Sequence, residues 1–253
     1  MGGKMSVQNS GVENRVALVT GGSGGIGRVV SERLARDGIA VAVHYAGNEE
    51  RANEVVEAIS AAGGRAMAVG GDVADEKAMT EAFDAIEHSF GGIDVVVHTA
   101  GLMILKPLAE FDLADLDRMH RTNIRGTFVV DQLAARRVRD GGAIVNFSSS
   151  VVKAAMPTYA PYAATKGAVE AVNLILAREL RGRDITVNAV APGPTATPLF
   201  LEGKDEETVA GMATQAPLER LGRPEDMAEV VSFLAGPARW VNGQVLRANG
   251  GII

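Results

Sequence analysis

Short apolar runs alternate along the chain with longer segments in which apolar residues recur at helical spacing. The runs are rich in Val and Ile, which is typical of parallel strands buried on both faces. The pattern predicts an α/β fold, a doubly wound parallel seven-stranded sheet with helices on both faces. Helices fill the intervals between strands, the longest near 112–139 and 161–181. Strands are predicted near 15–20, 39–45, 65–70, 93–98, 142–148, 184–190 and 243–248.

The chain length is that of a single domain. With 253 residues, 47% of them hydrophobic, the chain can bury one sizeable core. We predict a flexible N-terminal tail over 1–14 and one domain over 15–253. Residues 194–222 interrupt the alternation with several Pro and Gly. This segment is too long for an ordinary connection, so we predict a lid over a ligand, with a disordered surface loop as the alternative.

Composition and charge exclude several classes of function. There are 31 acidic and 25 basic residues, a net charge of −6, and no dense Lys/Arg stripe, so no nucleic-acid partner is expected. The chain has no cysteine, and its four histidines lack metal-ligand spacing, so no metal site is predicted. Because there is no long apolar run and no signal-peptide pattern, we predict a cytoplasmic protein that does not associate with membranes.

A glycine-rich turn joins the first predicted strand to the first helix. The strand ends at Thr20, the turn reads Gly21-Gly-Ser-Gly-Gly-Ile-Gly27, and the helix is predicted over 28–36. This order presents backbone N–H groups and a helix N-terminus to an anion, the usual cradle for a dinucleotide pyrophosphate. A purely structural tight connection is the alternative, but the context favours phosphate binding.

Tyr162 and Lys166 lie one helical turn apart, and Ser149 precedes them in the chain. Residues four apart on a helix share a face, and a neighbouring ammonium favours ionisation of a phenol. Tyr162 would then exchange a proton near neutral pH, although the usual pKa of tyrosine is about 10. Such pairs also occur on helices without catalytic function, so the interpretation depends on the rest of the sequence.

The turn from Thr20 to Gly27, together with Ser149, Tyr162 and Lys166, resembles the classical short-chain dehydrogenase/reductase family over about residues 14–253. The chain looks most like members labelled 3-oxoacyl carrier-protein reductases. One departure is His98-Thr99, where the family usually has two asparagines. Further matches, in chain order, are Asp72-Val73, Ala100-Gly101, Asn123, Pro192-Gly193, Thr197 and the stretch 242–251.

The resemblance implies a Rossmann domain that binds NAD(P), and a catalytic tetrad. Ser149 would hydrogen-bond the substrate oxygen, and Tyr162 would transfer the proton. Lys166 would lower the pKa of Tyr162 and hold the nicotinamide ribose, while Asn123 would retain a water. The cofactor-binding residues that it implies are Gly21, Ser23, Gly25, Ile26, Gly27, Tyr45, Asp72, Val73, Ala100, Gly101, Tyr162, Lys166, Pro192, Gly193, Thr195 and Thr197.

The choice of cofactor depends on the end of the second predicted strand. No Asp or Glu stands at its tip to bind the ribose 2′-hydroxyl of NAD. His44, Tyr45 and Asn48 are candidate donors to the 2′-phosphate of NADP. Gly24, in contrast, stands where many NADP enzymes of the family have an arginine. We predict NADP, with NAD as the alternative.

The resemblance implies hydride transfer between the nicotinamide and a carbonyl or secondary alcohol of a small molecule. NADPH-dependent ketone or 3-oxoacyl reduction is favoured. The alternatives are an NAD-dependent alcohol, sugar or steroid dehydrogenase, and a catalytically silent regulatory protein. Docking of an acyl carrier protein is disfavoured, because Asp140 stands where a second basic residue would accompany Arg183.

An apolar substrate pocket and a homotetramer complete the prediction. The tetramer would pair the two long helices across a two-fold axis, with the tail 249–253 as a further contact. An apolar pocket fits a bulky ketone better than an open-chain sugar. Its predicted lining is Leu102, Met103, Val151, Lys153, Met156, Tyr159, Leu199, Phe200 and Met212.

Overall fold

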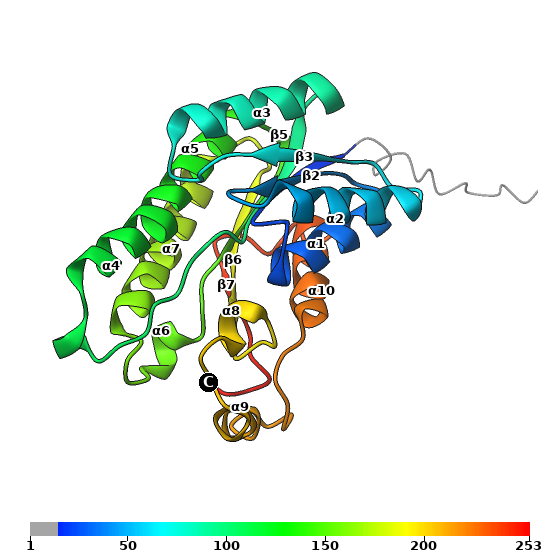
Figure 1. Cartoon of the computed structure of the whole chain (residues 1–253). Helices are drawn as coiled ribbons and strands as arrows, with labels where there is room; N and C mark the ends of the chain where they lie inside the picture. The colour runs from blue at the N-terminus through cyan, green and yellow to red at the C-terminus, as the bar shows by residue number, and fades with distance from the viewer. Residues whose placement is uncertain (1–14) are drawn as a thin grey trace, which may run out of the picture.

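The computed structural model describes residues 15–253, and the predicted tail over 1–14 lies outside the described residues. One parallel sheet runs through the molecule in the order β3-β2-β1-β4-β5-β6-β7 (Figure 1). Its strands are β1 (Val16–Thr20), β2 (Ala40–Tyr45), β3 (Ala66–Gly70), β4 (Ile93–His98), β5 (Val138–Phe147), β6 (Thr186–Pro192) and β7 (Val245–Ala248). The strand order reverses between β1 and β4, where doubly wound sheets bind ligands beyond the carboxyl ends of the strands. The predicted fold class is confirmed.

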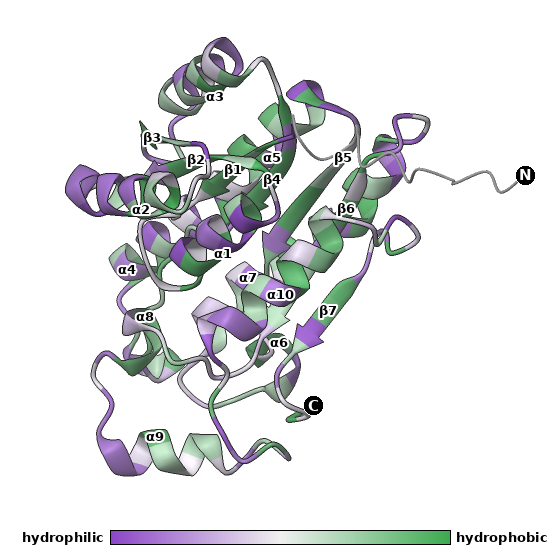
Figure 2. Cartoon of the chain, turned by 90° about the vertical axis from the view of Figure 1, so that its right-hand side faces the viewer, coloured by the Kyte–Doolittle hydropathy of each residue, from purple (hydrophilic) through white to green (hydrophobic). Residues whose placement is uncertain are grey.

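Helices cover both faces of the sheet. α3, α5 and α7 pack on one face, and α1, α2 and α10 pack on the other. The elements are α1 (Gly25–Arg36), α2 (Glu49–Ala61), α3 (Glu76–Phe90), η1 (Leu108–Glu110), α4 (Leu113–Met119), η2 (His120–Arg125), α5 (Gly126–Arg137), α6 (Val151–Ala154), α7 (Ala160–Glu179), α8 (Pro198–Leu201), α9 (Glu206–Ala213) and α10 (Pro224–Ala235). In both views α6, α8, α9 and the C-terminus gather at one end of the molecule (Figure 1, Figure 2).

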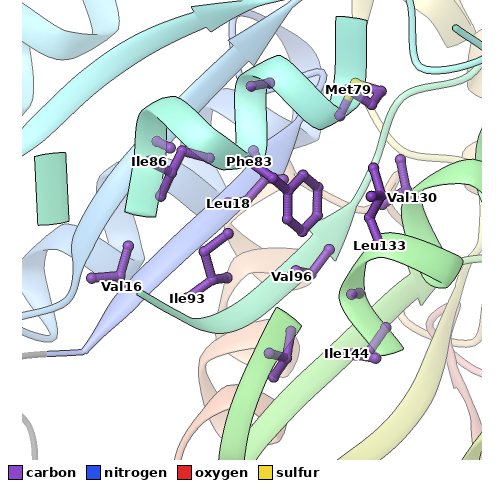
Figure 3. Packing of buried hydrophobic residues seen from close by; sticks show 14 of the residues in the cluster. Val16, Leu18, Met79, Phe83, Ile86, Ile93, Val96, Val130, Leu133 and Ile144 are labelled. Atoms are coloured by element: carbon purple, nitrogen blue, oxygen red, sulfur yellow. The ribbon is translucent and has the colours of Figure 1, made fainter. Parts of the chain in front are cut away.

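Successive residues of β1 belong to opposite layers of the core, as a strand buried on both faces requires. Leu18 packs with Phe83 of α3 in one layer, and Val19 packs with Val30 of α1 in the other. Figure 3 shows the first layer, with the Phe83 ring between the strands and Leu133 of α5. Figure 2 shows hydrophobic strands in the middle and hydrophilic outer surfaces on α2 and α3. The sheet therefore forms a rigid support for the loops at its carboxyl edge.

Three predicted boundaries are wrong by a few residues. The helix predicted over 28–36 begins at Gly25, inside the glycine turn. The strand predicted from residue 142 begins at Val138, because β5 pairs with Ile93 before a register shift of the β4–β5 ladder. The helix predicted over 112–139 contains a π-helical turn, η2, between α4 and α5, and it ends where β5 begins.

The segment 194–222 contains two short helices rather than a featureless loop. Thr197 caps α8 by accepting a hydrogen bond from Phe200, and Asp205 caps α9 by accepting one from Thr208. Such caps satisfy the free N–H groups of a helix start. A movement of this segment as a lid stays a prediction. None of the helices between residues 15 and 253 is long and apolar enough to cross a membrane.

Candidate active site

Ser149, Tyr162 and Lys166 line one cavity of about 350 Å³ at the carboxyl ends of β5 and β6. Ser149 follows β5, whereas Tyr162 and Lys166 project from the first turns of α7. Ser149 Oγ accepts from the Val151 amide at 3.4 Å and is a hydrogen-bonding neighbour of Tyr162. The Lys166 Nζ lies 5.7 Å from the centroid of the Tyr162 ring and donates to the Phe147 carbonyl at 2.8 Å. The sequence-predicted trio is therefore assembled at one site.

Burial is the main influence on the pKa values of Tyr162 and Lys166. It raises the pKa of Tyr162, while the hydrogen bond with Ser149 acts in the opposite direction. It also lowers the pKa of Lys166 to about 8. The predicted lowering of the Tyr162 pKa by Lys166 is thus not the main effect, because desolvation of a buried phenolate outweighs a cation at this distance. The arrangement holds Tyr162 as a neutral phenol that can donate a proton.

Asn123 lies in the π-helical turn η2 and is almost fully buried, 1% exposed. Its Oδ1 accepts from the Leu102 amide at 2.9 Å, and its Nδ2 donates to the Leu102 carbonyl at 2.8 Å and to Thr165 Oγ1 at 3.1 Å. Asn123 thereby joins the loop after β4 to α7. Its partner on α7 is Thr165, which lies between Tyr162 and Lys166 in the sequence. Short π-helical turns are frequent at functional sites. The predicted role of Asn123 in retaining a water stays a prediction.

The glycine turn fits a dinucleotide pyrophosphate. A Cβ on Gly27 would lie 2.3 Å from the Gly21 carbonyl oxygen and 2.6 Å from Thr99 Oγ1, so only glycine fits this position. Gly24 is the N-cap residue of α1 and offers no side-chain cap, and the first turn of α1 has no acidic residue. The N–H groups of that turn and the positive end of the helix dipole therefore suit an anion.

His98 and Thr99 support this turn, although the family usually has asparagines there. His98 Nδ1 and Thr20 Oγ1 are 2.8 Å apart, and Thr99 Oγ1 donates to the Thr20 carbonyl at 2.5 Å. The Ala100 amide donates to Thr20 Oγ1 at 3.3 Å. These contacts tie β4 to β1 directly below the turn, so the departure from the family pattern preserves a cross-strand link.

Of the candidate phosphate donors at the tip of β2, His44 is wrong, whereas Asn48 stays a prediction because its capping bond leaves its Nδ2 free to donate. His44 is buried, burial lowers its pKa to about 4, and its Nδ1 accepts from the Gly21 amide at 3.4 Å. Asn48 caps α2, with its Oδ1 accepting from the Arg51 amide at 2.9 Å. Tyr45 is half-buried at the strand tip, with the Glu49 carboxylate as a neighbour of its hydroxyl.

Arg51 is a residue that sequence reasoning missed. The first turn of α2 brings its Nη2 to within 3.9 Å of the point where a Cβ on Gly24 would lie. A cation thus stands beside the glycine turn, although the turn itself has no arginine. The signal in the sequence is an arginine shortly after the strand tip, within the first turn of the next helix.

Most of the other implied cofactor residues have clear positions in the structure. Asp72 forms an ion pair with Arg121, whose Nη2 lies 2.7 Å from Asp72 Oδ2. Val73 is buried, and a Cβ on Gly126 would lie 2.7 Å from its Cγ2, so its side chain packs against α5. Those that line the cavity with Tyr162 and Lys166 are Ile26, Gly101, Pro192, Gly193, Thr195 and Thr197.

The rest of the cavity wall is mainly apolar. The predicted Leu102 and Lys153 do not line it, and Leu102 is instead held by Asn123 through its main chain. Ile252 and Ile253, which were predicted only as part of a tetramer contact, also line it. No local pattern places them there, since only the folded chain brings them to the site. The predicted residues that line the cavity are Met103, Val151, Met156, Tyr159, Leu199, Phe200 and Met212.

Known proteins share this architecture over nearly the whole chain. A family profile described as Enoyl-(Acyl carrier protein) reductase matches residues 21–253. A short-chain type dehydrogenase/reductase of Picea abies is 44% identical, with 94% of this chain and 92% of that protein covered. Versicolorin reductase of Emericella nidulans is 37% identical, with 97% and 98% covered.

Among solved structures, the angucycline C-6 ketoreductase LanV with bound NADP superposes with a TM-score of 0.90 at 36% identity, covering 95% of this chain and 96% of that one. The chain is thus similar to these proteins in sequence and in overall fold over nearly its whole length. The chain belongs to the classical short-chain dehydrogenase/reductase family and is an oxidoreductase.

Proposed function

We propose that the protein reduces a bulky apolar ketone with NADPH. The observation that carries this proposal is that Ser149, Tyr162 and Lys166 line the same cavity as a set of apolar side chains. Ligand sites of this kind combine an apolar wall with a few convergent polar groups. NADPH, when bound, supplies the hydride, and the chain supplies the groups that position the carbonyl and move a proton.

Ser149 and Tyr162 act on the carbonyl oxygen. Both residues line the same cavity, and the Ser149 side chain is a hydrogen-bonding neighbour of Tyr162. Tyr162 donates its proton to the oxygen as negative charge develops on it, and Ser149 stabilises that charge as a neutral donor. Because burial raises the pKa of Tyr162, the phenol carries at neutral pH the proton that reduction of a carbonyl requires.

Lys166 and Asn123 restore the proton of Tyr162. Burial lowers the pKa of Lys166 to about 8, so this group can exchange a proton near neutral pH. Asn123 fixes the backbone on both sides of the site through Leu102 and Thr165. We propose that Asn123 also retains the water through which Lys166 reaches solvent.

The preference for NADPH rests on the tip of β2. Arg51 places a guanidinium beside Gly24, and a cation there suits a 2′-phosphate. Glu49, a neighbour of the Tyr45 hydroxyl, brings a carboxylate nearby and limits this preference. The bound NADP of LanV supports the same choice. The names of LanV, a ketoreductase, and of versicolorin reductase support the reduction of a ketone.

We also propose that the substrate is free rather than attached to a carrier protein. Arg183 pairs with Asp140 at 2.8 Å and donates to the Ala135 and Val138 carbonyls, so its guanidinium is already occupied. A homotetramer is supported by Phe128 of α5 and Ile175 of α7, which are 53% and 57% exposed. A cytoplasmic location stays a prediction from the sequence.

A panel of carbonyl compounds tests the proposed function. Purified protein with NADPH or NADH is assayed by the loss of cofactor absorbance against 1-tetralone, 2-butanone, a 3-oxoacyl thioester and an aldose. We expect the highest kcat/KM for 1-tetralone with NADPH. A higher kcat/KM for the aldose, or oxidation of alcohols with NAD as the only activity, would refute the proposal.

A further inference from the structure

The C-terminal segment 249–253 reaches the cavity that holds the catalytic groups. Ile252 and Ile253 line this cavity together with Ser149 and Tyr162, although they follow β7 at the far edge of the sheet. We infer that Ile252 and Ile253 determine specificity by forming the wall that selects bulky apolar ketones, and that Asn249 holds them in position. This inference rests on the proposed function.

Asn249 holds the segment to the loop that carries the candidate catalytic serine. Its side chain, 9% exposed, donates to Ser150 Oγ at 3.2 Å and to the Ile253 carbonyl at 3.4 Å. Its Oδ1 accepts from the Gly251 amide at 3.0 Å. Ser150 in turn donates to the Ala191 carbonyl of β6 at 3.2 Å. One buried amide therefore links the segment to the residue next to Ser149.

Two glycines turn the segment back toward the cavity. Gly250 and Gly251 have φ values of +66° and +93°, which glycine adopts without the penalty of other residues. A Cβ on Gly250 would lie 3.2 Å from Ala216 Cβ, and one on Gly251 would lie 3.1 Å from Pro217 Cγ. The turn thus packs tightly on the end of the segment 194–222, whose helices α8 and α9 also contribute to the cavity wall.

The position of the two isoleucines suits a role in selection rather than in chemistry. Their side chains carry no group that can transfer a proton, so they act only by contact with the substrate. Ile252 is partly buried and Ile253 is 47% exposed, so a ligand in the cavity would bury further apolar surface on them. A small ketone held by Ser149 and Tyr162 does not need this wall, whereas a bicyclic one does.

Kinetics of alanine variants test the wall directly. Ile252→Ala and Ile253→Ala should each lower kcat/KM for 1-tetralone about fivefold or more, and leave kcat/KM for 2-butanone and the KM for NADPH within about twofold. Asn249→Ala should reproduce this selective loss. Val56→Ala on α2, which does not line the cavity, is the matched control. Equal losses for both ketones in the two isoleucine variants would overturn the inference.

A second measurement does not depend on turnover. Because the chain has no cysteine, Ile252→Cys introduces a single thiol, whose rate of modification by N-phenylmaleimide is followed by mass spectrometry. We expect 1-tetralone to slow this reaction, and to leave unchanged the modification of Glu57→Cys on the exposed surface of α2. If the wild type reduces neither ketone, the proposed function fails, while protection of the thiol still supports the wall. Absence of protection would overturn the inference.

Discussion

Asp131 of α5 provides a quantitative test, because it is a carboxyl group buried with an incomplete set of partners. It is 3% exposed, and its Oδ2 accepts from Asn146 Nδ2 of β5 at 3.0 Å. Neither the Asp131 Oδ1 nor the Asn146 Oδ1 has a hydrogen-bond partner among the described residues. Burial raises the pKa of Asp131 to about 7. A protonated Asp131 can donate to Asn146, whereas a carboxylate cannot.

The sign of the pH dependence follows from this pKa. Between its usual pKa, about 4, and its folded value the folded protein binds one proton more than the unfolded chain, so stability falls as pH rises. Asp131→Asn keeps the acceptor and adds a permanent donor toward Asn146. The wild type loses this stability as the pH rises, and the variant does not. The free energy of unfolding of the variant, relative to that of the wild type, should therefore increase by up to about 3 kcal/mol from about pH 5 to about pH 8.

Urea unfolding at these two pH values, at equal protein concentration, measures the effect. Asp117→Asn, at an exposed position of α4, is the control and should give the same difference from wild type at both. If Asp131→Asn were less stable than the wild type at about pH 8, or if the difference were independent of pH, the account of a buried neutral carboxyl would be refuted.

Three further predictions concern the cofactor site and assembly. Gly27→Ala should weaken NADPH binding at least about tenfold by fluorescence titration, since its Cβ would meet the Gly21 carbonyl; unchanged affinity would contradict the close approach. Tyr45→Asp and Arg51→Ala should each lower NADPH affinity more than NADH affinity; a wild-type preference for NADH would refute the assignment. Light scattering should show a tetramer, and a monomer of 26.4 kDa at micromolar concentration would contradict it.

The fold was predictable from the sequence because its signals are local. Each buried strand is a short apolar run, and the glycine-rich turn indicates where the first strand ends and the first helix begins. Predicted strand boundaries were wrong where pairing with a distant strand determines them. The strand β5 begins at Val138 rather than at residue 142 because Val138 pairs with Ile93 of β4. The π-helical turn around Asn123 has no distinctive local pattern and was missed for the same reason.

In the candidate site, too, the residues set by local spacing were predicted, and those placed by long-range packing were not. Ser149, Tyr162 and Lys166 have fixed spacing, so the sequence predicted them as a group. The orientation of His44 and the position of Arg51 beside Gly24 depend on how β2 and α2 pack against the glycine turn. Ile252 reaches the cavity only after β7 has joined the sheet. The predicted pKa shift of Tyr162 had the wrong sign because burial could not be read from spacing.

Tyr162→Phe tests the central claim most directly, because it removes only the hydroxyl that transfers the proton. The account predicts that kcat for ketone reduction falls at least about a hundredfold, while the dissociation constant for NADPH, measured by fluorescence titration, stays within about twofold of wild type. A variant that kept more than about a tenth of the wild-type kcat would contradict the assignment of Tyr162 as the proton donor.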